Sequence, residues 1–199
     1  MKLYKRITFL MLCAVIIFSF AACNPGDGIP FLSTKSKTTL PDNTVTVTFP
    51  EGYTIVQIAQ KLEQNKVCSA QAFLEACKKP VAGIEIDNAD DRVFLLEGYI
   101  FPDTYEFYLE SDAQSVVDKF IENYNSKITD EMKQRAKTLG YTMDQMMTLA
   151  SVIQKECDAD IDECANVSSV FHNRLKDPAS FPKLESDVTT FYISQNLKD

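Results

Sequence analysis

The sequence predicts an α+β fold, in which a small unit of one strand and two helices precedes a mostly helical region. Residues 45–49 alternate Val, Thr, Val, Thr and Phe, which is the period of a half-buried strand. From residue 54 onward, apolar residues recur every three or four positions, which is the period of a helix. Several of these stretches follow a residue that commonly caps helices. The composition agrees, because 199 residues with 45% hydrophobic and 24% charged side chains suit one globular domain or two small ones.

The first two predicted helices follow the strand closely. Thr54 caps the first, which ends at residues 65–66. Ser69 begins the second, which ends before Pro80 because proline cannot continue a helix. Together with the strand, these helices predict a small unit over residues 44–88. The apolar positions of the two helices are Ile55, Ile58, Ala59 and Leu62, then Phe73, Leu74 and Cys77.

The remaining residues, 89–199, are predicted to be mostly helical. A polar, acidic stretch at residues 88–91 marks the expected boundary. Asp130 starts a short charged helix that Gly140 ends, and residues 165–175 again show a helical pattern. The clearest stripe between them consists of Val116, Val117, Phe120, Ile121 and Tyr124.

A glutamate at the edge of an apolar helix face is the strongest candidate for chemistry. Thr142 and Gln145 form a capping box that begins the helix, and Glu156 lies three residues past Ile153. A carboxylate that shares a surface with the core is partly desolvated, which raises its pKa and suits a general acid. A boundary glutamate that pairs with a lysine or caps a loop is the alternative. The predicted apolar stripe is Met146, Leu149, Ala150 and Ile153.

The first 23 residues have the pattern of a targeting segment. Three basic residues precede the low-polarity run of residues 7–20, and Cys23 follows two alanines, as at a lipoprotein cleavage site. An uncleaved membrane span is the alternative, but a span needs about 20 apolar residues, so lipidation of Cys23 is favoured. Either arrangement tethers the chain to the extracytoplasmic face of the cell membrane. Residues 24–43, rich in Pro, Gly, Ser, Thr and Lys, predict a linker.

The net charge and the cysteine content limit the classes of partner, disulfide and metal site that the sequence predicts. A net charge of −8 argues against nucleic-acid binding. Outside the cytoplasm, Cys157 and Cys164 are the obvious pair, because they flank an acidic loop; unpaired thiols, including Cys68 and Cys77, are the alternative. With one histidine and no Cys-x-x-Cys pair, the sequence predicts no metal site, and no cofactor motif is recognised.

Four segments occur in the order found in the YceG-like endolytic murein transglycosylases, and the chain resembles that family. The first is close to the family's LEGYLFPDTYEF, the second is the Glu156 helix, and the last two resemble VFYNRL and LQSDPTVQY. Residues 45–53 are similar to the start of the family's small LysM-like domain. The resemblance therefore implies a LysM-like domain over 44–88 and a transglycosylase domain over 89–199. The four segments are Leu96–Phe107, Leu149–Glu156, Val170–Leu175 and Leu184–Tyr192.

The resemblance also implies a reaction. Lytic transglycosylases cleave the β-1,4 bond between N-acetylmuramic acid and N-acetylglucosamine with one acid/base residue, and the C6 hydroxyl of the muramic acid closes a 1,6-anhydro ring. Glu156 matches the acid/base position, whereas Gln154 stands where many members carry a second glutamate. The implied substrate-binding residues are Glu97, Tyr99, Asp103, Tyr105, Ser151, Asn173, Arg174 and Asp187.

Several of these residues have a plainer interpretation. The segment from Glu97 to Tyr105 could be a buried structural loop. Arg174 could bind a muropeptide carboxylate bidentately or pair with Glu156 or Asp187. His172 is expected to be a packed aromatic residue, because the family places a ring there. The LysM-like unit could bind wall glycan or only position the next domain.

The implied partners are the glycan strands of peptidoglycan, the membrane through the N-terminal anchor, and peptidoglycan synthases. A non-catalytic, membrane-anchored lipoprotein that binds peptidoglycan is the competing hypothesis. The family continues past Tyr192 with a GLPPGPI-like segment, which this sequence does not contain, so either the coding sequence is truncated or the chain is a shortened member. In both cases we expect an incomplete transglycosylase domain with a groove open on one side.

Overall fold

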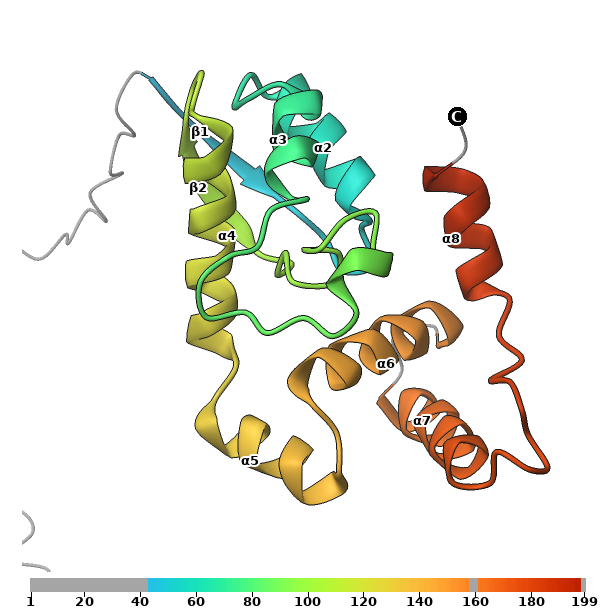
Figure 1. Cartoon of the computed structure of the whole chain (residues 1–199). Helices are drawn as coiled ribbons and strands as arrows, with labels where there is room; N and C mark the ends of the chain where they lie inside the picture. Colours follow the sequence, from blue (N-terminus) through green and yellow to red (C-terminus); the bar gives the residue numbers. More distant parts are fainter. Residues whose placement is uncertain (1–42, 158–160, 198–199) are drawn as a thin grey trace, which may run out of the picture. The chain divides into compact units, whose positions relative to one another are not determined.

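The computed structural model describes residues 43–157 and 161–197 (Figure 1). The predicted targeting segment, Cys23 and nearly all of the predicted linker lie outside these residues. The described residues belong to one compact unit of two strands, seven α-helices and one short 3-10 helix. This mixture confirms the predicted α+β class. The elements are β1 (Thr44–Thr48), α2 (Ile55–Gln64), α3 (Ala70–Ala76), η1 (Ala89–Asp91), β2 (Thr104–Tyr108), α4 (Ala113–Lys127), α5 (Asp130–Leu139), α6 (Met143–Glu156), α7 (Ile161–Lys176) and α8 (Val188–Asn196).

The two strands form an antiparallel pair. Thr44 faces Tyr108 and Thr48 faces Thr104, and the hydroxyls of Thr48 and Thr104 lie 2.8 Å apart. Strand β1 matches the predicted strand, but β2 falls in a segment for which the sequence predicted a groove or loop. Its residues alternate between exposed and buried, as the period of a strand requires.

The main hydrophobic core is aromatic and continues across the predicted boundary near residue 88. Phe120 of α4 is fully buried, and its ring centroid lies 5.3 Å from that of Phe49 and 4.5 Å from that of Tyr105. Phe73 of α3 packs on the same ring at 5.9 Å. Edge-to-face contacts of this kind add to the free energy gained by burying apolar surface. The boundary does not divide the core because β1 finds its hydrogen-bonding partner in β2.

Helix starts follow the predicted caps. Thr54 and Gln57 form a capping box at α2, and Thr142 and Gln145 form the predicted one at α6. Ser69 caps α3 by accepting a hydrogen bond from the backbone N–H of residue 72. In each case a short polar side chain satisfies a backbone donor that the first helical turn leaves unpaired.

The inward face of α6 differs from the predicted stripe. Ala150 is exposed, whereas Val152 and Leu149 are buried and form a second, small core with Phe171 of α7. The reason lies at the start of the helix, where the Asp144 carboxylate is 2% exposed and turns inward. It accepts hydrogen bonds from the Tyr99 hydroxyl at 2.6 Å and from the Arg92 guanidinium at 2.5 Å. This buried polar contact sets the rotation of α6.

No helix in the described ranges is long and apolar enough to cross a membrane.

Candidate active site

Glu156 is the last residue of α6, and its side chain is exposed. It lies four residues after Val152, on the face of the helix that packs in the small core, but the helix extends one turn beyond that core. The partial burial expected for this carboxylate is therefore not found. Its Oε1 atom accepts a hydrogen bond of 2.5 Å from the Ser186 hydroxyl.

Ser186 comes from the loop before α8 and connects that loop to the end of α6. The backbone N–H of Val188 donates to the Ser186 Oγ at 3.4 Å, while the hydroxyl hydrogen is directed to Glu156. One side chain thus contacts the candidate carboxylate and the first turn of α8. Ser186 lies in the family-like segment from Leu184 to Tyr192, but no role was predicted for its side chain.

A second carboxylate, Glu97, has the environment that the sequence predicted for Glu156. Its Oε2 accepts a hydrogen bond of 2.6 Å from the Tyr192 hydroxyl, and both of its oxygens lie 3.2 Å from the backbone nitrogen of Ile55. Burial raises the pKa of Glu97, while the hydrogen bonds from Tyr192 and Ile55 and the nearby Lys155 charge oppose the rise. The same burial, together with the Glu97 charge, raises the pKa of Tyr192.

Lys155 connects α6 to the turn after β1. Its ammonium donates to the backbone carbonyl of Gly52 at 2.5 Å and acts electrostatically on Glu97. Nearby, the Thr54 hydroxyl donates to the Asn196 side-chain oxygen at 2.8 Å. The start of α2, the Glu97 loop, the end of α6 and helix α8 therefore meet at one place. Sequence reasoning missed this because each contact joins residues more than 40 positions apart.

Tyr99 and Tyr105 are buried in the main core and do not lie beside Glu156, contrary to the expectation. Tyr99 is 2% exposed and Tyr105 is 5% exposed, and their hydroxyls are used internally. Tyr99 donates to Asp144, and Tyr105 donates to the Phe101 carbonyl at 2.6 Å. Burial raises the pKa of Tyr105 to about 12. Both rings belong to the main core, because Tyr99 in the loop before β2 contacts Tyr124 of α4, and Tyr105 on β2 contacts Phe120 of the same helix.

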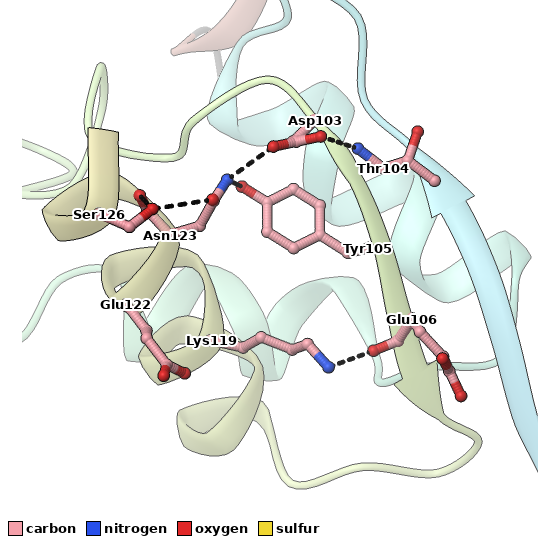
Figure 2. A pocket seen from close by; sticks show the side chains of 8 residues that line it. All are labelled: Asp103, Thr104, Tyr105, Glu106, Lys119, Glu122, Asn123 and Ser126. Carbon is pink, nitrogen blue, oxygen red and sulfur yellow. Dashed lines mark hydrogen bonds between the residues drawn. The ribbon is translucent and has the colours of Figure 1, made fainter. Parts of the chain in front are cut away.

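Asp103 lines a depression to which Glu156 does not contribute (Figure 2). This depression, about 340 Å³ in volume, lies between β2 and α4. The Asn123 amide points between Asp103 and the Tyr105 hydroxyl and donates to both, at 3.2 and 2.7 Å (Figure 2). The hydrogen bond from the Thr104 N–H, with further help from Lys127 and Asn123, lowers the pKa of Asp103. Asp103 is thus placed with α4, and its neighbours in the depression are Thr104, Tyr105, Glu106, Lys119, Glu122, Asn123 and Ser126.

Arg174 is paired internally, but with partners other than those expected. Its guanidinium donates to the Leu184 carbonyl, lies 3.6 Å from the Glu185 carboxylate and stacks near the Phe181 ring. Arg174 lies within α7, so its reach is toward the loop that follows the helix rather than toward Glu156. Its contacts hold the segment that leads to Ser186.

Three further predicted residues are exposed on separate elements. Ser151 donates to the Thr148 carbonyl of its own helix at 2.8 Å. Asn173 lies on α7, and Asp187 occupies the position before α8 without capping that helix through its side chain.

Half-buried His172 packs on Tyr141, with a hydroxyl-to-Nδ1 distance of 3.2 Å. The position of His172 agrees with the predicted packing role.

The expected disulfide is present. Cys157, directly after Glu156, is bonded to Cys164 in α7, whereas Cys68 and Cys77 are free thiols. Burial raises the pKa of Cys68 to about 11, with help from the Asp112 and Glu63 charges. Among the described residues, no group of three His, Cys, Asp or Glu side chains is placed to hold a metal ion.

Fold and site together define an α+β protein whose exposed carboxylate at a helix end is held by a serine from a later loop. The chain belongs to the YceG-like family, since the sequence model of that family matches residues 31–199. A crystal structure of a YceG-like protein from Listeria monocytogenes has the same fold, with a TM-score of 0.61 at 22% identity, over 83% of this chain and 56% of that one.

Two relatives named endolytic murein transglycosylase are similar in sequence. The protein from Streptococcus pneumoniae serotype 2 (strain D39 / NCTC 7466) is 28% identical over 170 residues, which cover 76% of this chain and 30% of that protein. The protein from Bacillus subtilis (strain 168) is 27% identical over 165 residues, which cover 77% of this chain and 44% of that protein. This chain therefore spans less than half the length of either relative.

Proposed function

We propose that the protein is an endolytic lytic transglycosylase, with Glu156 as its acid/base residue. The observation that carries the proposal is the position of Glu156: it matches the family's acid/base position, it is exposed at the end of α6, and it is held by Ser186 at 2.5 Å. The names of the relatives from Streptococcus pneumoniae and Bacillus subtilis support the same reaction and a peptidoglycan substrate.

The reaction needs one group that first gives and then takes a proton. Glu156 protonates the glycosidic oxygen as the bond from C1 of N-acetylmuramic acid breaks. The resulting carboxylate then accepts the proton of the C6 hydroxyl as that oxygen bonds to C1. No water enters, so a second carboxylate to activate one is not required, unlike in most glycosidases. Because the Ser186 hydroxyl donates to Oε1, the other oxygen of Glu156 is proposed to exchange the proton with the substrate.

Exposed polar side chains on α6, on α7 and just before α8 are proposed to contact the glycan strand. Asn173, Asp187 and Ser151 are exposed and remain candidates for this role. Glu97 holds the start of α2 and α8 rather than facing solvent, so its proposed role is to support the site. Arg174 is proposed to hold the loop that carries Ser186.

The proposed location is the extracytoplasmic face of the cell membrane, with the chain anchored through lipidated Cys23. The disulfide between Cys157 and Cys164 supports this, because structural disulfides persist in oxidising compartments. We also propose that residues 44–88 bind wall glycan as a LysM-like unit, and that the protein associates with peptidoglycan synthases.

The competing function is a non-catalytic peptidoglycan-binding lipoprotein. The exposure of Glu156 favours this function, because general acids are commonly found at sites that exclude water. Binding to glycan would then occur without formation of anhydro ends.

Digestion of purified sacculi separates the two functions. We expect the wild-type chain to release muropeptides with 1,6-anhydro ends, detected by mass spectrometry, and Glu156→Gln to lower their formation about 100-fold or more. The thermal midpoint should not change, because the side chain is exposed. Glu131→Gln, an exposed change on α5, is the matched control and should keep full activity. Sacculus binding without anhydro products from the wild type would establish the non-catalytic function instead.

A further inference from the structure

We propose that the Cys157–Cys164 disulfide positions Glu156 for proton transfer, so that activity depends on the oxidation state of this pair. The inference rests on the proposed function, in which Glu156 is the acid/base residue. It concerns two cysteines that take no part in the reaction itself.

Glu156 lies where its helix is least restrained by its own hydrogen bonds. Cys157 caps α6 with an extended backbone, φ −112° and ψ 144°, and its N–H donates to the Ile153 carbonyl at 3.1 Å. The carbonyls of the last turn have no partner within the helix, and helix ends fray for this reason. Without another restraint, the main chain at Glu156 would be mobile.

The disulfide supplies that restraint beyond the reach of the small apolar core. Ile153 on α6 and Val167 on α7 are the apolar residues of this core nearest to the two cysteines in sequence. Cys157 lies one turn after Ile153, and Cys164 lies one turn before Val167. The disulfide therefore joins α6 to α7 beyond their apolar contact, at the end of α6 that carries Glu156. Cys157 is 6% exposed, although Glu156 beside it is exposed.

Glu156 thus has two separate restraints. The disulfide holds its main chain through the neighbouring residue, and Ser186 holds its carboxylate at 2.5 Å. Breaking the disulfide leaves the Ser186 hydrogen bond at the carboxylate and the bond from Lys155 to the Gly52 carbonyl, but no covalent link between α6 and α7 at this end. Because a displacement of about 1 Å at a catalytic group can cost about 100-fold in rate, we expect reduction to lower kcat at least about tenfold.

Dithiothreitol is the reductant for the test, and the exchange is balanced. One of its thiolates attacks a sulfur of the disulfide and releases the other cysteine sulfur, which takes up a proton. Its second thiol then closes a ring, leaving Cys157 and Cys164 as thiols and the reagent as a cyclic disulfide. Two electrons and two protons pass from the reagent to the protein, and removal of the reagent followed by mild oxidation reverses the change.

The experiment compares the oxidised and reduced full chain on purified glycan strands. We expect reduction to lower kcat and leave KM unchanged, and reoxidation to restore kcat. Cys164→Ser should show the same low kcat in both conditions, because it breaks the disulfide without changing the residue beside Glu156. Cys68→Ser is the matched control; it removes a free thiol and should respond to dithiothreitol as the wild type does.

Hydrogen exchange distinguishes positioning from general unfolding. On reduction, amides of residues 153–157 should exchange faster, while those of α2 in the main core should not change. Full activity of reduced wild type and of Cys164→Ser would overturn the inference and leave the proposed function intact. Faster exchange in α2 as well would assign the loss to unfolding and also overturn it. An inactive oxidised wild type would instead overturn the proposed function, and the inference with it.

Discussion

The region from β1 to α4 and the region from α6 to α8 are held together in different ways. In the first, 21 buried residues form one cluster around the rings that contact Phe120. In the second, the buried cluster consists of three residues, Leu149, Val152 and Phe171. The disulfide and the hydrogen bonds of Ser186 and Tyr192 supply the other contacts that hold this region. Apolar packing therefore stabilises one region, whereas directional bonds fix the geometry of the region that carries the candidate chemistry. Regions with few buried apolar contacts open at lower free-energy cost.

The sharpest test of this contrast removes one buried ring from each region. Phe120→Ala should lower the free energy of unfolding by about 3–5 kcal/mol, because it leaves a cavity among fixed rings. Phe171→Ala should cost about half as much, because a small core can collapse around the gap. Urea unfolding followed by circular dichroism measures both. Equal losses would mean that the two regions are packed alike.

The contact between the regions at Asp144 should give the next largest effect. Asp144→Asn leaves the largely buried Arg92 guanidinium without its charged partner, so we expect a loss of about 2 kcal/mol. The fully exposed Asp130, which pairs with Lys133 on α5, is the matched position, and Asp130→Asn should not move the unfolding midpoint. An unchanged midpoint in Asp144→Asn would show that the buried pair does not fix α6.

A smaller effect is expected where α8 contacts the main core. Tyr192→Phe removes the hydrogen bond to Glu97, which should cost about 1 kcal/mol and raise the pKa of Glu97 further, because that bond favours the charged form. In the wild type, proton binding by Glu97 stabilises the fold at low pH, and this contribution is lost as pH rises through its raised pKa. In the variant, the loss should move to higher pH.

Nuclear magnetic resonance of the Glu97 carboxyl carbon, titrated with pH, measures this shift. Tyr108→Phe, at a tyrosine that is 59% exposed on β2, is the control and should leave the titration unchanged. A Glu97 titration that does not move in Tyr192→Phe would mean that α8 is not held at this carboxylate.

Local rules recovered the elements whose signals lie within a few residues. The cap at Thr54 and the capping box of Thr142 with Gln145 were predicted because their signals lie within three positions, and the α4 stripe because it has the helical period. The close pairing of Cys157 with Cys164 was predictable for the same reason.

The errors arose where distant residues decide. Ala150 was expected to face inward because it is apolar, but the rotation of α6 depends on Asp144, whose partners Arg92 and Tyr99 lie about 50 positions earlier. Likewise, Glu156 was expected to be partly buried because its spacing from Ile153 places it at the edge of the apolar face of α6. The burial of its side chain depends instead on how far the neighbouring helices extend along α6. The raised carboxyl pKa is found at Glu97, which is covered by Tyr192 from the far end of the chain.

The bond from Lys155 to the Gly52 carbonyl limits which sequences can keep this site. A carbonyl is part of every residue, so no substitution at position 52 can remove the acceptor itself. The limit lies in the backbone, because Gly52 has φ of +74°, which L-residues rarely adopt; an added Cβ would itself fit, since it would lie in ordinary contact with the lysine ammonium at 3.5 Å. A related sequence keeps this contact only if it meets two independent conditions. Position 52 must be a glycine, because the backbone has a positive φ there, and position 155 must carry a cationic side chain long enough to contact the carbonyl.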